Sequence, residues 1–157
     1  MVSILMPVDG SPEALEAVRL ALRLRLHGLA FTAVLLNVQE PPHLYEVVLA
    51  PDAEVIEGAS HDAGEHALQA AHALLDAAGV ACAALVVTGD LAQQVVEQAE
   101  LQGCDLIVLA LQDHAVAHAV ERHSRVPVLR VPHQPPEVDE QDLAELGEPV
   151  EAQAPAA

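Results

Sequence analysis

The sequence predicts an α/β fold built on a parallel β-sheet, and three observations support this prediction. Short apolar runs, typical of strands buried on both faces, alternate with amphipathic helical segments over residues 1–132. Turn-forming glycines and prolines separate the segments. The length of 157 residues favours one domain with a sizeable core. Such alternation is typical of a parallel sheet whose crossovers are right-handed.

Five apolar runs are predicted to be strands. They cover residues 2–8, 31–38, 80–88, 105–111 and 126–131. Each run is far too short to cross a bilayer as a helix. The only aromatic residues are Phe31 and Tyr45, so alanine, leucine and valine must fill the core.

Four helices are predicted between these strands. Ser11 is a suitable N-cap for the first helix, Pro12 suits its first position, and the helix is expected to end near Gly28. The other three are expected at about 53–78, from Asp90 to about 102, and from Asp113 to about 123. Helical spacing predicts inward faces of Leu15, Val18, Leu22 and Leu26, then Ala67, Ala71, Leu74 and Ala78, and last Ala115, Val116, Ala119 and Val120.

The charge excludes several partners. With 24 acidic residues, six arginines and no lysine, the chain has a formal net charge of −18. Phosphate backbones and anionic lipid surfaces would repel it, so neither nucleic acid nor a membrane is expected as a partner. Residues 1–7 are apolar but have no basic region before them, so they are not read as a signal peptide and a cytoplasmic location is expected. Cys82 and Cys104 are accordingly expected to be reduced thiols.

Residues 133–157 differ from the rest of the chain. They contain four prolines and seven acidic residues, with no lysine or arginine. Such a composition predicts a disordered acidic tail after a domain over 1–132. A transient helix at 139–146 is the alternative.

Four segments taken in order resemble the universal stress protein family. They are Ile4-Leu5-Met6-Pro7-Val8-Asp9-Gly10-Ser11, Thr88-Gly89-Asp90, the strand at 104–110, and the run at 125–131. The resemblance covers about residues 1–132. It implies a doubly wound five-stranded parallel sheet of order 3-2-1-4-5, with helices on both faces, and often a homodimer. In that order Cys82 and Cys104 lie too far apart for an intrachain disulfide.

The resemblance also implies where a nucleotide would bind. Nucleotide-binding members have a loop of the form Gly-x2-Gly-x9-Gly-Ser/Thr after strand four, whose amides hold phosphates. Here no glycine occurs between Gly103 and Gly147, so the loop is absent. The remnant of the family's pocket is its adenine side, at Asp9, Gly10, Ser11 and Val38. The same Asp9-Gly10-Ser11 sequence is equally explained as a strand-to-helix turn.

The remaining histidine, serine and cysteine residues are best explained without a functional site. His114 and His118 lie four apart, a spacing that can hold a metal, and His61, Asp62, Glu65 and His66 form a second cluster. A solvated helix face is the preferred explanation for both. No serine has the setting of a nucleophile elbow, and Asp105 is expected to raise the pKa of Cys104. We therefore expect no catalytic residue, no metal and no cofactor.

The edge strand in the implied order is the run at 126–131. Such an apolar edge invites pairing with a second copy, and its interface residues are predicted to be Val126, Val128, Leu129 and Val131. The sequence thus predicts a universal stress protein-like regulatory module that neither hydrolyses nor binds ATP. The alternatives are a nucleotide-binding protein or ATPase with an atypical phosphate site and, more weakly, a histidine-based metal-binding protein. Any other protein partner is left open.

Overall fold

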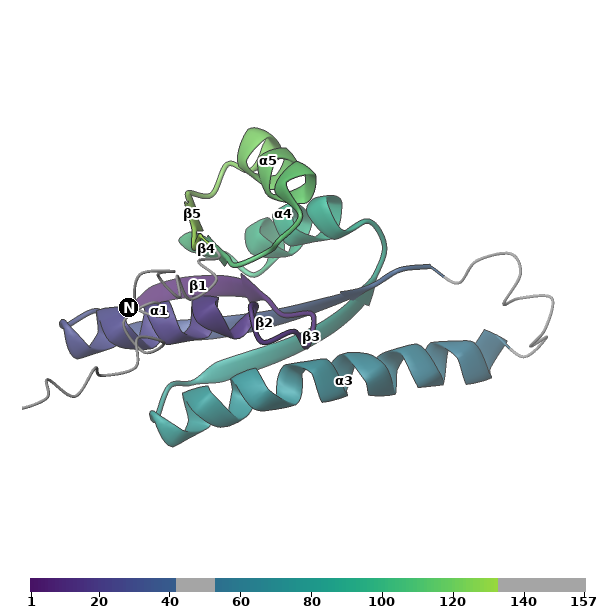
Figure 1. Cartoon of the computed structure of the whole chain (residues 1–157), viewed down its shortest axis with the longest axis horizontal. Helices are drawn as coiled ribbons and strands as arrows, with labels where there is room; N and C mark the ends of the chain where they lie inside the picture. The colour runs from purple at the N-terminus through teal and green to yellow at the C-terminus, as the bar shows by residue number, and fades with distance from the viewer. Residues whose placement is uncertain (42–52, 133–157) are drawn as a thin grey trace, which may run out of the picture.

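The computed structural model describes residues 1–41 and 53–132. Strands and helices alternate along them, as Figure 1 shows. The elements are β1 (Val2–Pro7), α1 (Leu15–Leu26), β2 (Phe31–Gln39), α3 (Ala53–Ala77), β3 (Cys82–Thr88), α4 (Leu91–Leu101), β4 (Leu106–Leu109), α5 (His114–His123) and β5 (Val128–Arg130). Each predicted strand and helix is present. The predicted tail at 133–157 lies outside the described residues.

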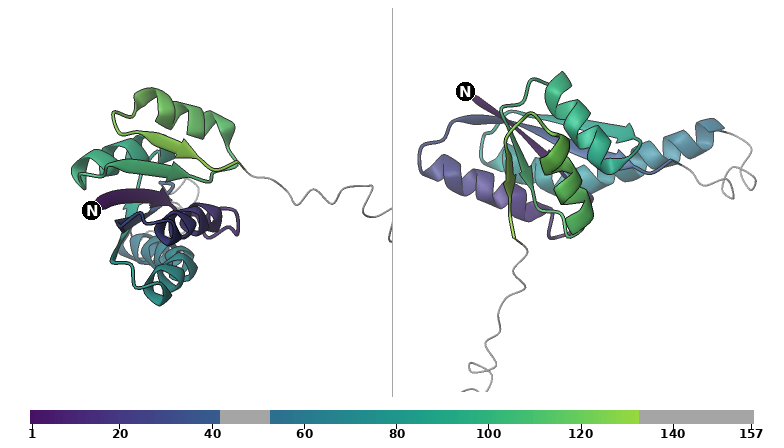
Figure 2. Two further views of the ribbon diagram at one scale, coloured as in Figure 1. Left: turned by 90° about the vertical axis from the view of Figure 1, so that its left-hand side faces the viewer. Right: turned by 90° about the horizontal axis from the view of Figure 1, so that it is seen from above.

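The strands form one parallel sheet of order β3-β2-β1-β4-β5, which confirms the predicted topology (Figure 2). The central strand β1 pairs with β2 from Val2 opposite Phe31 to Pro7 opposite Leu36. On its other side β1 pairs with β4. The chain order reverses between β1 and β4, and in doubly wound sheets ligands bind beyond the carboxyl ends of the strands at such a point.

Two hydrophobic cores lie on opposite faces of the sheet. Helices α1 and α3 cover one face, where Ile4, Met6 and Leu35 are fully buried. Helices α4 and α5 cover the other face, where Leu5 and Ile107 are fully buried. Successive side chains of a strand point to opposite faces, so continuous apolar runs are required in the central strands.

The predicted inward faces of the helices were partly wrong. Leu74 of α3 is 36% exposed and Leu26 of α1 is 85% exposed. Ala115 of α5 is also exposed. The predicted Val18, Ala71 and Val120 are buried, and so are Leu68, Leu75 and Ala117, which were not predicted. These helices have alanine on several sides, so spacing alone permits more than one inward face. The face of α3 is set by its contact with the sheet, where Gly64 lies against Val86 and Asn37.

The two cysteines are free thiols, as predicted. Strands β2 and β1 separate β3, which contains Cys82, from β4, which Cys104 precedes. Burial raises the pKa of both thiols. For Cys104 the hydrogen bond from the Ser3 hydroxyl opposes this shift, and the Asp105 carboxylate adds to it. Both thiols are therefore poor nucleophiles at neutral pH.

Candidate functional site

The turn after β1 holds its polar side chains in local hydrogen bonds. The Asp9 carboxylate accepts from the Ser11 amide at 2.9 Å and from the Ser11 hydroxyl at 2.5 Å. The Ser11 oxygen in turn accepts from the Ala14 amide at 3.3 Å. Helix α1 begins at Leu15, later than predicted, because residues 12–14 form a turn in which the Leu15 amide bonds to the Pro12 carbonyl. Turn formation alone thus accounts for Asp9 and Ser11.

Gly10 lies between this turn and helix α3. Its φ is +87°, a conformation that side chains rarely adopt, and a Cβ added there would lie 3.2 Å from the Cβ of Ala67. Helix α3 therefore approaches the end of β1 closely at this point. A glycine here is required by the backbone and by this packing.

Residues at the end of β2 complete this region. Val38 is partly buried, and its side chain packs in the core beneath α4, on the face of the sheet opposite α3. The neighbouring Asn37 is 3% exposed and donates from Nδ2 to the Val8 carbonyl at 2.8 Å. Gln39 donates to the Asn37 Oδ1 at 2.5 Å. Asn37 thus joins the ends of β1 and β2, a role that sequence reasoning missed because polar residues in strands usually face solvent.

In the connection from β4 to α5, the free amides at the start of the helix are hydrogen-bonded to a side chain of the same segment. Asp113 is the N-cap of α5, and its Oδ1 accepts from the Ala115 amide at 2.8 Å and the Val116 amide at 3.2 Å. These are amides that a helix N-terminus could otherwise direct at an anion. The carboxylate would also repel an anion here. Hence the start of α5 is a capped helix end.

A hollow of about 600 Å³ lies beside this connection, lined by Leu111, Gln112, His114, Arg130, Val131 and Pro132. The Arg130 guanidinium lies 3.0 Å from the His114 Nδ1 and 3.3 Å from a Glu121 carboxylate oxygen. Sequence reasoning did not identify Arg130 as a cation near this connection. The pairing of Arg130 with α5 depends on the adjacency of β5 and α5, which residue spacing does not reveal.

Some of the histidines have local hydrogen-bond or ion-pair partners. His61 lies 3.1 Å from Glu65, and the His123 Nδ1 lies 2.8 Å from the Ala119 carbonyl. Over residues 1–41 and 53–132, no group of three or more histidine, cysteine or acidic side chains is arranged to hold a metal ion. Within the same ranges, no helix is long and apolar enough to cross a membrane.

Comparisons with known proteins agree with the topology. The model of the universal stress protein family matches residues 1–132. A crystal structure of a universal stress protein family member from Burkholderia pseudomallei is 30% identical, with a TM-score of 0.67, and covers 83% of this chain and 96% of that chain. The chain belongs to the universal stress protein family. No curated protein matches it in sequence.

More distant structures share the fold. A universal stress protein family protein from Arabidopsis thaliana, solved with AMP bound, is 18% identical with a TM-score of 0.66, over 85% of this chain and 93% of that one. The universal stress protein from Archaeoglobus fulgidus in complex with dAMP is 20% identical with a TM-score of 0.58, over 84% of this chain and 98% of that one.

Proposed function

We propose that this protein is a non-catalytic regulatory module of the universal stress protein family that does not bind ATP with useful affinity. The observation that carries the proposal is the capped start of α5. Asp113 occupies two amides in a connection that contains no glycine, so the backbone offers no cradle for phosphates. We place the protein in the cytoplasm, with residues 1–132 as its domain.

The alternative is adenine nucleotide binding at an atypical site, and one observation favours it. Arg130 and His114 line the hollow at the carboxyl ends of β4 and β5, where the guanidinium could approach a monophosphate. The Arabidopsis and Archaeoglobus relatives carry AMP and dAMP. Glu121 already pairs with Arg130, and the net charge of −18 opposes a polyanion such as ATP.

Calorimetry separates these two proposals. We expect no ATP binding at ATP concentrations up to about 1 mM with magnesium present. A dissociation constant above this concentration corresponds to a binding free energy weaker than about −4 kcal/mol. AMP is titrated in parallel, together with the Arg130→Gln variant. A low micromolar dissociation constant for ATP would overturn the proposal, and AMP binding that Arg130→Gln abolishes would establish the alternative.

We further propose a homodimer formed by antiparallel pairing of β5 with its copy. Three of the four predicted interface residues pack partly into this chain's own cores, whereas Leu129 is 38% exposed. The Pro127 carbonyl accepts from the Ile107 amide, and the Val131 amide donates to the Leu109 carbonyl. Residues 127 and 131 therefore direct their backbone toward β4, which leaves the groups of Val128 on the free edge. The missing donor of Pro127 is thus no obstacle to pairing.

Leu129→Asp is expected to shift this dimer to monomer, because two carboxylates would then lie close to the twofold axis. Sedimentation at tens of micromolar measures the change. Leu101→Asp is the matched control, since Leu101 is 68% exposed and belongs to α4, so this variant should leave the dimer intact. A wild-type monomer at this concentration would contradict the proposal.

A further inference from the structure

Strand β3 is an unprotected edge of the sheet. It pairs with β2 along one side from Cys82 to Thr88, and within the described residues no strand lies on its other side. Its seven residues contain no charge, proline or glycine. Edge strands usually carry such features because they prevent pairing with other chains. The strand at the opposite edge, β5, is shorter and has three residues.

The register shows which backbone groups of β3 are free. The Ala33 amide donates to the Ala81 carbonyl, and the Gly89 amide donates to the Gln39 carbonyl. The odd-numbered residues of β3 therefore direct their backbone toward β2. Because residues alternate in a strand, the even-numbered ones direct amide and carbonyl groups away from the sheet. These residues are Cys82, Ala84, Val86 and Thr88.

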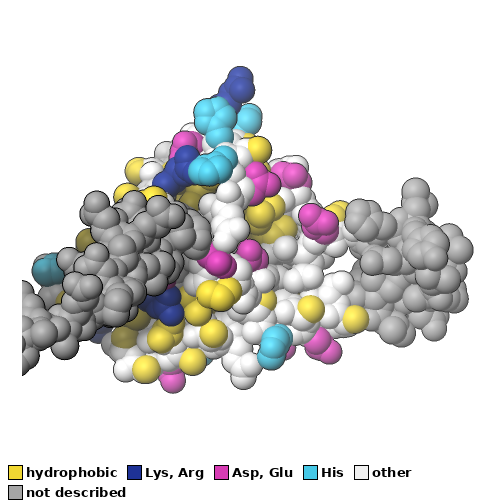
Figure 3. Space-filling view, viewed as in Figure 1, with side chains coloured by type: hydrophobic (Ala, Val, Ile, Leu, Met, Phe, Trp, Pro, Cys, Tyr) yellow, Lys and Arg dark blue, Asp and Glu magenta, His cyan; other side chains and the backbone are white. Residues whose placement is uncertain are grey.

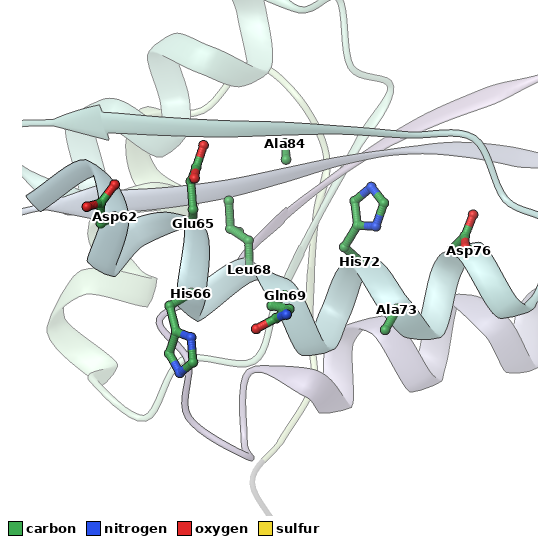
Figure 4. Close-up of a pocket in the computed structure, with 9 residues that line it drawn as sticks. All are labelled: Asp62, Glu65, His66, Leu68, Gln69, His72, Ala73, Asp76 and Ala84. Atoms are coloured by element: carbon green, nitrogen blue, oxygen red, sulfur yellow. The ribbon is translucent and has the colours of Figure 1, made fainter. Parts of the chain in front are cut away.

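A groove runs beside this free edge, between β3 and α3, with a volume of about 660 Å³. A small side chain opens it, because Ala84 is exposed and forms part of its lining. Glu65, His72 and Asp76 project from α3 toward the strand, as Figure 4 shows. Asp62 lines the same groove one turn earlier on α3.

The charge of the groove has one sign. Its lining includes three carboxylates and no arginine. In Figure 3, acidic and histidine side chains mark the α3 edge of the molecule. Asp62 and Asp76 are 14 positions apart, which is about 21 Å along a helix. Same-face side chains of a strand recur every ~6.6 Å, so about four of them would span this row.

We propose that β3 binds an extended basic peptide segment of another protein, which adds a sixth strand to the sheet. Its backbone pairs with the free groups of β3, and its lysine or arginine side chains on one face enter the groove opposite Glu65 and Asp76. A second copy of this chain is a poor occupant because it would bring two acidic rows together. The acidic segment 133–157 has the same sign as the groove and is disfavoured for the same reason. This inference goes beyond the proposed function and does not depend on whether a nucleotide binds.

The test uses the full chain and a capped nine-residue peptide in which arginine alternates with valine or threonine. We expect saturable binding, with amide chemical-shift changes concentrated on the even-numbered residues of β3. The Glu65→Gln/Asp76→Asn variant should weaken binding at least tenfold. Glu97→Gln/Glu100→Gln, which makes the same charge change on exposed positions of α4, should not.

Two further measurements separate strand addition from attraction between charges. A peptide with alternate backbone N-methyl groups keeps its charge but cannot pair with β3, so it should bind at least tenfold more weakly. Ala84→Pro removes an amide hydrogen that faces the free edge, where proline is tolerated, and should also weaken binding. Equal affinity for the methylated peptide, shift changes centred on β5, or self-association through β3 would overturn the proposal.

Discussion

Gly64→Ala is expected to destabilise the protein by about 3 kcal/mol, enough to lower its Tm by about 10 °C. A Cβ at this position would lie 2.5 Å from the Val86 Cγ1 and 2.9 Å from the Asn37 Oδ1. Both neighbours are held in strands, so α3 would have to move away from the sheet. In an exposed helix interior the same substitution would instead stabilise by about 1 kcal/mol. Whether a glycine-to-alanine change in this helix stabilises or destabilises the protein therefore depends on tertiary packing.

Gly58→Ala is the matched control in the same helix. Among the described residues, nothing lies within 4 Å of a Cβ added at Gly58, so this variant should be as stable as the wild type or more stable. Thermal unfolding followed by circular dichroism measures both variants. A Gly64→Ala protein that melts at or above the wild-type temperature would show that α3 does not pack closely on β2 and β3.

Asn37→Asp is expected to cost about 3 kcal/mol near neutral pH, because an unpaired carboxylate would be buried against the Val8 carbonyl. Burial would raise the pKa of this carboxyl in the folded state above its unfolded value of about 3.9. The protonated acid can donate to Val8 as the amide does. The variant should therefore be near wild-type stability in acid and lose stability as pH rises through its folded pKa.

Urea unfolding of both proteins between about pH 4 and pH 8 tests this pH dependence, since the stability difference should widen as pH rises from about 3.9 to the folded pKa and then stay level. Asn37→Ala is the control, because it removes the donor to Val8 without adding a titrating group. The stability that Asn37→Ala loses, about 1–3 kcal/mol, should stay constant over the same pH range. A constant difference for Asn37→Asp as well would mean that position 37 is open to solvent.

The local patterns of the chain determined the strands and helices. Continuous apolar runs identified the strands, and Asp90 and Asp113 marked helix starts that the structure confirms through their bonds to Gln93 and Ala115. The strand order followed from the resemblance of ordered motifs. These features are readable because capping and periodicity depend on residues close together in the chain.

The contacts between elements could not be read in this way. Spacing predicted Leu74 on the inner face of α3, whereas Leu75 is buried, since an alanine-rich helix fits the sheet in more than one rotation. The pairing of Arg130 with His114 and the role of Asn37 join residues from different elements. Local sequence patterns are therefore sufficient to identify the elements, the acidic charge and the absence of glycine between Gly103 and Gly147. The contacts between side chains become visible in the folded chain, because those distances arise when β1, β2 and α3 pack together.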